Sequence, residues 1–90
     1  MTIALVAMPL YAVLFDENPV PRAEAVAQMF VAQRSPEQLS RMLDEIEREL
    51  TQPTGEVRAV HDNPQSEALC RDFLREFAAA GRRLTLPPDN

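Results

Sequence analysis

The sequence predicts a mainly helical domain, a small bundle of three to five helices around one core. Apolar residues recur at helical spacing over residues 35–52. An alanine-rich, helix-forming segment precedes them at 22–33, and a second amphipathic stretch follows at 64–81. The alternative is an α+β fold with short strands near residues 3–8 or 10–15, 56–60 and 82–86.

A chain of 90 residues suits one domain, because at this size roughly 60–68% of the unfolded surface becomes buried. We expect that domain to span residues 1–86, with a frayed tail at 87–90. An apolar content of 46% with 26% charged residues favours a folded chain over a disordered one. The predicted core consists of Leu14, Val26, Phe30, Leu39, Leu43, Ile46, Leu69, Phe73 and Phe77.

The apolar N-terminus, MTIALVAMPLYAVLF, is interpreted as buried core. Asp16 ends this run short of the about 20 apolar residues of a membrane span. No basic residue precedes Arg22, although a signal peptide needs a positive start, so an exported protein is the lesser alternative. Because Pro9 disfavours the α region at Met8, residues 2–8 are open to an extended conformation. Pro9 then opens a short helix or belongs to a buried strand.

The helix over residues 35–52 has start and stop signals of its own. Ser35 suits the N-cap, Pro36 the first helical position, and Gln38 completes a capping box. Pro53 and Gly55 end the helix. Its apolar stripe is Leu39, Met42, Leu43, Ile46 and Leu50. The helix at 22–33 is expected to be its spatial neighbour, because the connection between them is short.

After Pro53 the pattern is ambiguous, since Val57 and Val60 suit either a helix or a short strand. Asn63 is expected to cap the last helix, with Pro64 as its first residue. Gly81 lies where a C-terminal cap glycine belongs. The apolar stripe of this helix is Leu69, Cys70, Phe73, Leu74 and Phe77.

No catalytic, cofactor or metal site is predicted, so the protein is not expected to be an enzyme. Cys70, the only cysteine, excludes an internal disulfide and fits a reducing compartment. It lies on an apolar stripe, which favours an inert thiol over a catalytic pair with His61. A single Cys and a single His cannot build a four-ligand zinc site. Gly55 and Gly81 stand alone, so no phosphate-binding loop is present.

The net charge of −5 disfavours nucleic acid and anionic membranes as partners and favours a basic protein. Within two turns of the 35–52 helix, carboxylates outnumber Arg41 and Arg48. A solvated helix face is the alternative interpretation. The candidate partner-binding residues on this acidic side are Asp44, Glu45, Glu47 and Glu49.

Residues 22–53 combine an alanine-rich helix, a Ser-Pro-Glu step and a helix with a leucine-leucine, acidic, Glu-Ile core that ends near a proline. This third of the chain resembles a family of small immunity proteins of bacterial contact-dependent growth inhibition systems. The family's aromatic segment before these helices has only Tyr11, Phe15 and Asp16 as counterparts here. The matching residues are Phe30, Val31, Ser35, Pro36, Glu37, Leu39, Leu43, Glu45, Ile46 and Leu50.

The resemblance implies a cytoplasmic protein that binds and neutralises the toxin domain of its own delivery system. Such proteins act by binding, so the resemblance implies no catalytic residue. Many of these toxins are basic nucleases, in agreement with the acidic composition. A small helical adaptor or an antitoxin-like regulator that uses an apolar groove is the alternative function.

Overall fold

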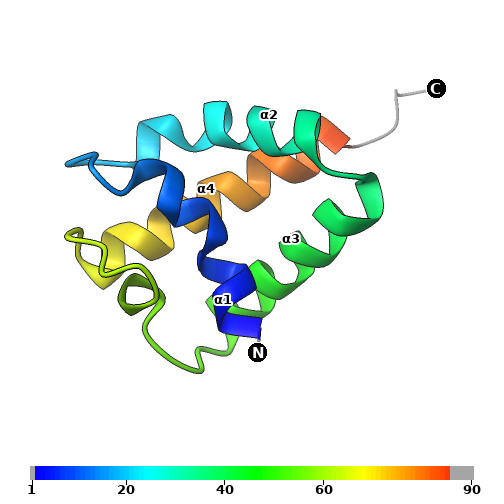
Figure 1. Cartoon of the computed structure of the whole chain (residues 1–90). Helices are drawn as coiled ribbons and strands as arrows, with labels where there is room; N and C mark the ends of the chain where they lie inside the picture. Colours follow the sequence, from blue (N-terminus) through cyan, green and yellow to red (C-terminus); the bar gives the residue numbers. More distant parts are fainter. Residues whose placement is uncertain (1, 86–90) are drawn as a thin grey trace.

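Helix α4 lies between α2 and α3 and packs against both, while α1 packs against α3 (Figure 1). These elements belong to a computed structural model that describes residues 2–85. The side chains of one hydrophobic core come from every α-helix. The elements, in chain order, are α1 (Thr2–Ala7), the 3-10 helix η1 (Met8–Val13), the 3-10 helix η2 (Val20–Arg22), α2 (Ala23–Gln33), α3 (Pro36–Thr51), the 3-10 helix η3 (Val57–Ala59) and α4 (Glu67–Thr85).

The predicted helical bundle is confirmed, because 76% of the described residues are helical and none of them is in a strand. The α+β alternative is therefore wrong for residues 2–85. Residues 3–8, a strand in that alternative, are helical, and most of 10–15 belongs to η1. A lone strand would leave its backbone N–H and C=O groups without partners, whereas a helix bonds them internally. Residue 86 and the tail at 87–90 lie outside the described residues.

Helix α3 forms as its local signals predict. The Ser35 hydroxyl oxygen accepts from the Gln38 N–H at 3.2 Å, and the Gln38 side chain accepts from the Ser35 N–H at 3.3 Å. This capping box satisfies N–H groups that a helix start otherwise leaves unbonded. Of the predicted stripe, Leu50 is half-buried and the other four residues are buried.

Three phenylalanines form the aromatic part of the core. The rings of Phe30 and Phe77 meet edge to face at 5.4 Å between centroids, and Phe73 stacks against Phe77 at 6.2 Å. Leu14 and Leu69, both predicted core residues, are only half-buried. The predicted core residues that are buried are Val26, Phe30, Leu39, Leu43, Ile46, Phe73 and Phe77.

The 3-10 geometry of η1 explains why Leu14 is not in the core. A 3-10 helix has three residues per turn, so residues three apart share a side. Leu10 and Val13 are three apart and fully buried, which turns Leu14 partly towards solvent. Leu69 lies in the first turn of α4, at the margin of the core.

Both ends of α4 differ from the prediction. The helix begins at Glu67 rather than at Pro64, and the Ser66 hydroxyl oxygen accepts from the Leu69 N–H at 3.1 Å. Ser66 is thus the residue that caps the helix. At the other end, the helix continues through Gly81 to Thr85. A Cβ atom on Gly81 would lie 2.9 Å from a methyl carbon of Leu43, so the glycine permits close packing of α4 against α3.

Candidate functional site

The carboxylates predicted to bind a partner separate into two groups. Asp44 and Glu47 are exposed and Glu45 is half-buried, on the solvent-facing side of α3. Glu49 is 4% exposed. The expected acidic side therefore consists of Asp44, Glu45 and Glu47, and Glu49 is removed from it.

Arginines of the chain itself partly neutralise this acidic side. Arg82 reaches across from α4 and donates to Asp44 at 2.5 Å and to both carboxylate oxygens of Glu47 at 2.8 and 3.0 Å. These hydrogen bonds, first from Glu47 and then from Asp44, raise the pKa of Arg82 above its ordinary value. On α3, Arg48 lies 3.5 Å from Glu45. The sequence could not reveal the Arg82 contacts, because Arg82 is 35 residues from Glu47.

An open hollow of about 500 Å³ follows the solvent-facing side of α3. Charged side chains of both signs line it. The lining residues are Pro36, Glu37, Ser40, Arg41, Asp44, Glu45 and Arg48.

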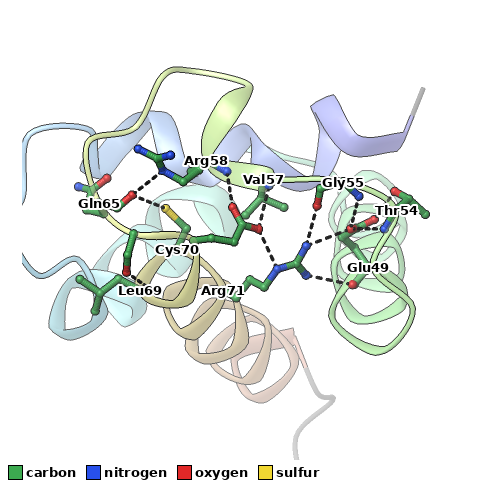
Figure 2. Close-up of polar contacts among 11 residues, drawn as sticks. Glu49, Thr54, Gly55, Val57, Arg58, Gln65, Leu69, Cys70 and Arg71 are labelled. Atoms are coloured by element: carbon green, nitrogen blue, oxygen red, sulfur yellow. Dashed lines mark hydrogen bonds and ion pairs between the residues drawn. The ribbon is translucent and has the colours of Figure 1, made fainter.

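Glu49 instead holds the segment that follows α3 (Figure 2). Its carboxylate accepts from the backbone N–H and the hydroxyl of Thr54, both at 2.7 Å, and from the Gly55 N–H at 3.4 Å. The Arg71 guanidinium donates to it at 3.3 Å. Burial acts to raise the pKa of Glu49, but the hydrogen bonds from Thr54, Arg71 and Gly55 outweigh it and lower that pKa below its ordinary value.

Arg71 connects α4 to both α3 and the segment after it (Figure 2). Its guanidinium donates to the Glu49 carbonyl at 3.1 Å, to the Gly55 carbonyl at 2.7 Å and to the Glu67 carboxylate at 2.8 Å. Glu67 in turn accepts from the backbone N–H groups of Val57 and Arg58, which explains why a helical turn rather than a strand forms there. We call Glu49, Thr54, Gly55, Glu67 and Arg71 the Arg71 network.

Two exposed aromatic side chains form a second surface feature, which the sequence does not indicate. Tyr11 is 68% exposed and Phe15 is 93% exposed, at the end of η1 and just after it. The Tyr11 ring meets the His61 ring edge to face at 5.5 Å. Phe15 lines a hollow of about 290 Å³ with Asp16, Glu17, Pro64 and Gln65. Both aromatic side chains therefore border the loop that leads into α4.

Two buried amide side chains hold the backbone beneath these aromatics. Gln65, 5% exposed, donates from its side-chain nitrogen to the carbonyls of Val13 at 2.8 Å and Asp16 at 2.5 Å. Asn63, 1% exposed, donates to the Leu10 carbonyl at 3.4 Å and to the Gln65 side chain at 3.1 Å. The sequence gives no signal for these roles, because Asn63 and Gln65 lie about 50 residues from the carbonyls that they bond.

Cys70 and His61 contact different residues and do not form a pair. Cys70 is fully buried, and burial, aided by Glu67, raises the pKa of its thiol. Its sulfur lies 4.0 Å from the Gln65 carbonyl, whereas His61 contacts Tyr11. Within residues 2–85, no group of three or more His, Cys, Asp or Glu side chains is arranged to hold a metal ion. In the same part of the chain, the helices are too short or too polar to cross a membrane.

Comparison of the chain with known protein families, with curated proteins and with solved structures finds no match.

Proposed function

We propose that this protein is a cytoplasmic, non-catalytic immunity protein that binds and neutralises a basic toxin domain, with the acidic side of α3 in the interface. The observation that supports this proposal is the position of Asp44, Glu45 and Glu47. They gather on one solvent-facing side of a capped helix, in a chain with a net charge of −5. A basic partner complements this charge.

The ion pairs already made by these carboxylates do not prevent binding. The side chains of Arg82, Asp44 and Glu47 are all more than a third exposed. Exposed ion pairs contribute only about 0–1 kcal/mol, because water screens them and ordering the side chains costs entropy. An arginine or lysine of a partner can therefore replace Arg82 at small cost. Asp44 and Glu45 also line the hollow along α3, together with Arg41 and Arg48.

The toxin-neutralising form of the proposal rests on the sequence resemblance over residues 22–53. A small adaptor or an antitoxin-like regulator is the second candidate, favoured by the exposed apolar rings of Tyr11 and Phe15. Neighbouring genes separate the two. A large secreted effector encoded upstream supports immunity, whereas a lone gene or a short toxin gene supports the second candidate.

Affinity capture from the source cell, followed by mass spectrometry, tests the proposal. We expect to recover a basic protein domain whose expression alone stops growth. Co-expression of this protein should restore growth, and adding it to the purified domain should abolish the domain's activity. A captured partner that is not toxic, or whose activity is unchanged in the complex, would contradict an immunity function.

A further inference from the structure

We propose that Tyr11 and Phe15 form a second docking surface, which receives an apolar side chain flanked by basic residues from a protein partner. This aromatic surface goes beyond the proposed function, because it is separate from the acidic side of α3. The turn after η1 and the loop before α4 lie together at the left of Figure 1, whereas α3 begins at the right.

Phe15 differs from every other phenylalanine of the chain. The remaining three, Phe30, Phe73 and Phe77, are at most 5% exposed, whereas Phe15 is 93% exposed. Leaving such a large apolar side chain in water forgoes the favourable free energy of its burial. Tyr11 is exposed as well, and its contact with His61 places it beside the loop that Phe15 borders through Pro64 and Gln65. Exposed aromatic side chains of this kind are typical centres of protein interfaces.

The backbone that carries these rings is held in place before any partner arrives. Gln65 and Asn63 are almost completely buried, and their amide groups bond the carbonyls of Leu10, Val13 and Asp16. With a further hydrogen bond of 3.4 Å from Gln65 to the Leu14 carbonyl, four side-chain hydrogen bonds hold the backbone of residues 10–16, which is not α-helical. A surface ordered in advance loses less conformational entropy on binding, which favours affinity.

The charges around the aromatic surface specify the partner. Asp16 and Glu17 line the hollow beside Phe15, and Asp62 follows His61 in the bordering loop. Asp16 pairs with Arg22 at 3.4 Å, while Glu17 and Asp62 make no ion pair within the described residues. An arginine or lysine next to an apolar anchor complements this arrangement. A second copy of this acidic chain or an anionic membrane would instead be repelled.

Selection of a displayed library of random short peptides on the immobilised full chain tests the inference. We expect enriched peptides to combine arginine or lysine with one large apolar residue. Fluorescence anisotropy with a selected peptide should show about tenfold weaker binding to Phe15→Ser, the loss typical of an interface centre. Phe15→Leu, which keeps an apolar side chain, should retain most of the affinity.

Met29→Ser is the matched control, because Met29 is 39% exposed on α2 and does not line the hollow. Its affinity should equal that of the wild type. Circular dichroism should show unchanged folding in Phe15→Ser, since Phe15 has almost no packing to lose. The inference fails if no peptide is enriched, if enriched peptides lack basic residues, or if Phe15→Ser binds normally.

Two further results would also overturn it by assigning another occupant. In sedimentation velocity, a dimer that dissociates in Phe15→Ser would assign the aromatic surface to a second copy of the chain. Binding to phosphatidylcholine or phosphatidylglycerol vesicles that is lost in Phe15→Ser would assign it to a lipid surface. Capture of the toxin partner is a separate measurement, so failure of this inference leaves the proposed function testable.

Discussion

At Glu49, four donor groups converge on one buried carboxylate. The ion pair with Arg71 is useful only while both partners are present, because a lone buried charge is costly. Arg71 also carries contacts to Glu67 and Gly55, so a change at Glu49 alters the whole Arg71 network. The carboxylate thereby fixes the segment between α3 and η3.

Replacing Glu49 with glutamine should lower the free energy of unfolding by about 3 kcal/mol, the lower end of the range for breaking a buried ion pair. The amide keeps the shape of the side chain but removes the charge that faces Arg71. Urea denaturation measures the loss. Glu47→Gln, on the solvent-facing side of the same helix, should change stability by less than about 1 kcal/mol. Equal effects of the two substitutions would contradict a structural role for Glu49.

The same carboxylate makes stability depend on acid pH. The pKa of Glu49 is lower in the folded state than its ordinary value of 4.5, so the folded protein binds the proton more weakly than the unfolded chain. Its contribution is fully present above pH 4.5 and is lost as pH falls through the folded pKa. The stability difference between the wild type and Glu49→Gln should therefore shrink below pH 4.5, measured by thermal unfolding. A constant difference at all pH values would show that charge is not involved.

Among elements, the contact of α4 with α3 depends on Gly81. Alanine in a helix interior is favoured over glycine by about 0.5–1 kcal/mol. Here the added methyl group would press on Leu43, which is fully buried, and such overpacking costs about 1–3 kcal/mol. We expect Gly81→Ala to be destabilising by about 1 kcal/mol.

A double-mutant cycle checks this explanation. In a Leu43→Val background the side chain is one methylene shorter, so Gly81→Ala should become neutral or stabilising. Chemical denaturation of the four proteins in the cycle gives the coupling energy. A Gly81→Ala change that is equally harmful in both backgrounds would contradict the contact with Leu43.

Gln65, in the loop before α4, should hold the backbone at the end of η1 and just after it in one conformation. Gln65→Ala removes the amide whose nitrogen donates to the Val13 and Asp16 carbonyls and whose oxygen accepts from the Asn63 side chain, at a cost of about 1–3 kcal/mol. Hydrogen exchange should rise in peptides that cover residues 10–17. Gln28→Ala on the exposed side of α2 is the control and should change neither quantity. Unchanged exchange in Gln65→Ala would refute this role.

Local signals predicted the elements that local chemistry controls. Helix α3 has its cap, proline and apolar stripe within its own residues, so its bounds followed from the sequence. The first residue of α4 did not follow from the sequence. Asn63 resembles an N-cap, but its side chain donates to the Leu10 carbonyl, and Ser66 caps the helix instead. Likewise Glu49 lies off the apolar stripe, and Arg71, 22 residues away, helps to bury it. Contacts between distant residues decided each of these points.

For the molecule as a whole, the sequence predicts the net charge, but it does not predict which side chains pair or stay exposed at the surface. The net charge of −5 follows from composition, but the pairing of Arg82 with Asp44 and Glu47 depends on the packing of α4 on α3. The exposure of Phe15 does not follow from the sequence either, since an apolar run predicts burial.

Because the net charge is −5, association with a basic partner should be fast and strongly salt-dependent.

The acidic side of α3 is tested most directly by the association rate of the captured partner at low salt, measured by stopped flow. Glu45→Arg with Glu47→Arg should slow association and weaken its salt dependence, because both charges lie on the proposed interface. Glu24→Arg with Glu76→Arg changes the net charge equally on α2 and α4, so it controls for long-range attraction alone. We expect a clearly slower rate for the α3 pair than for the control pair. Equal rates for the two pairs would contradict it.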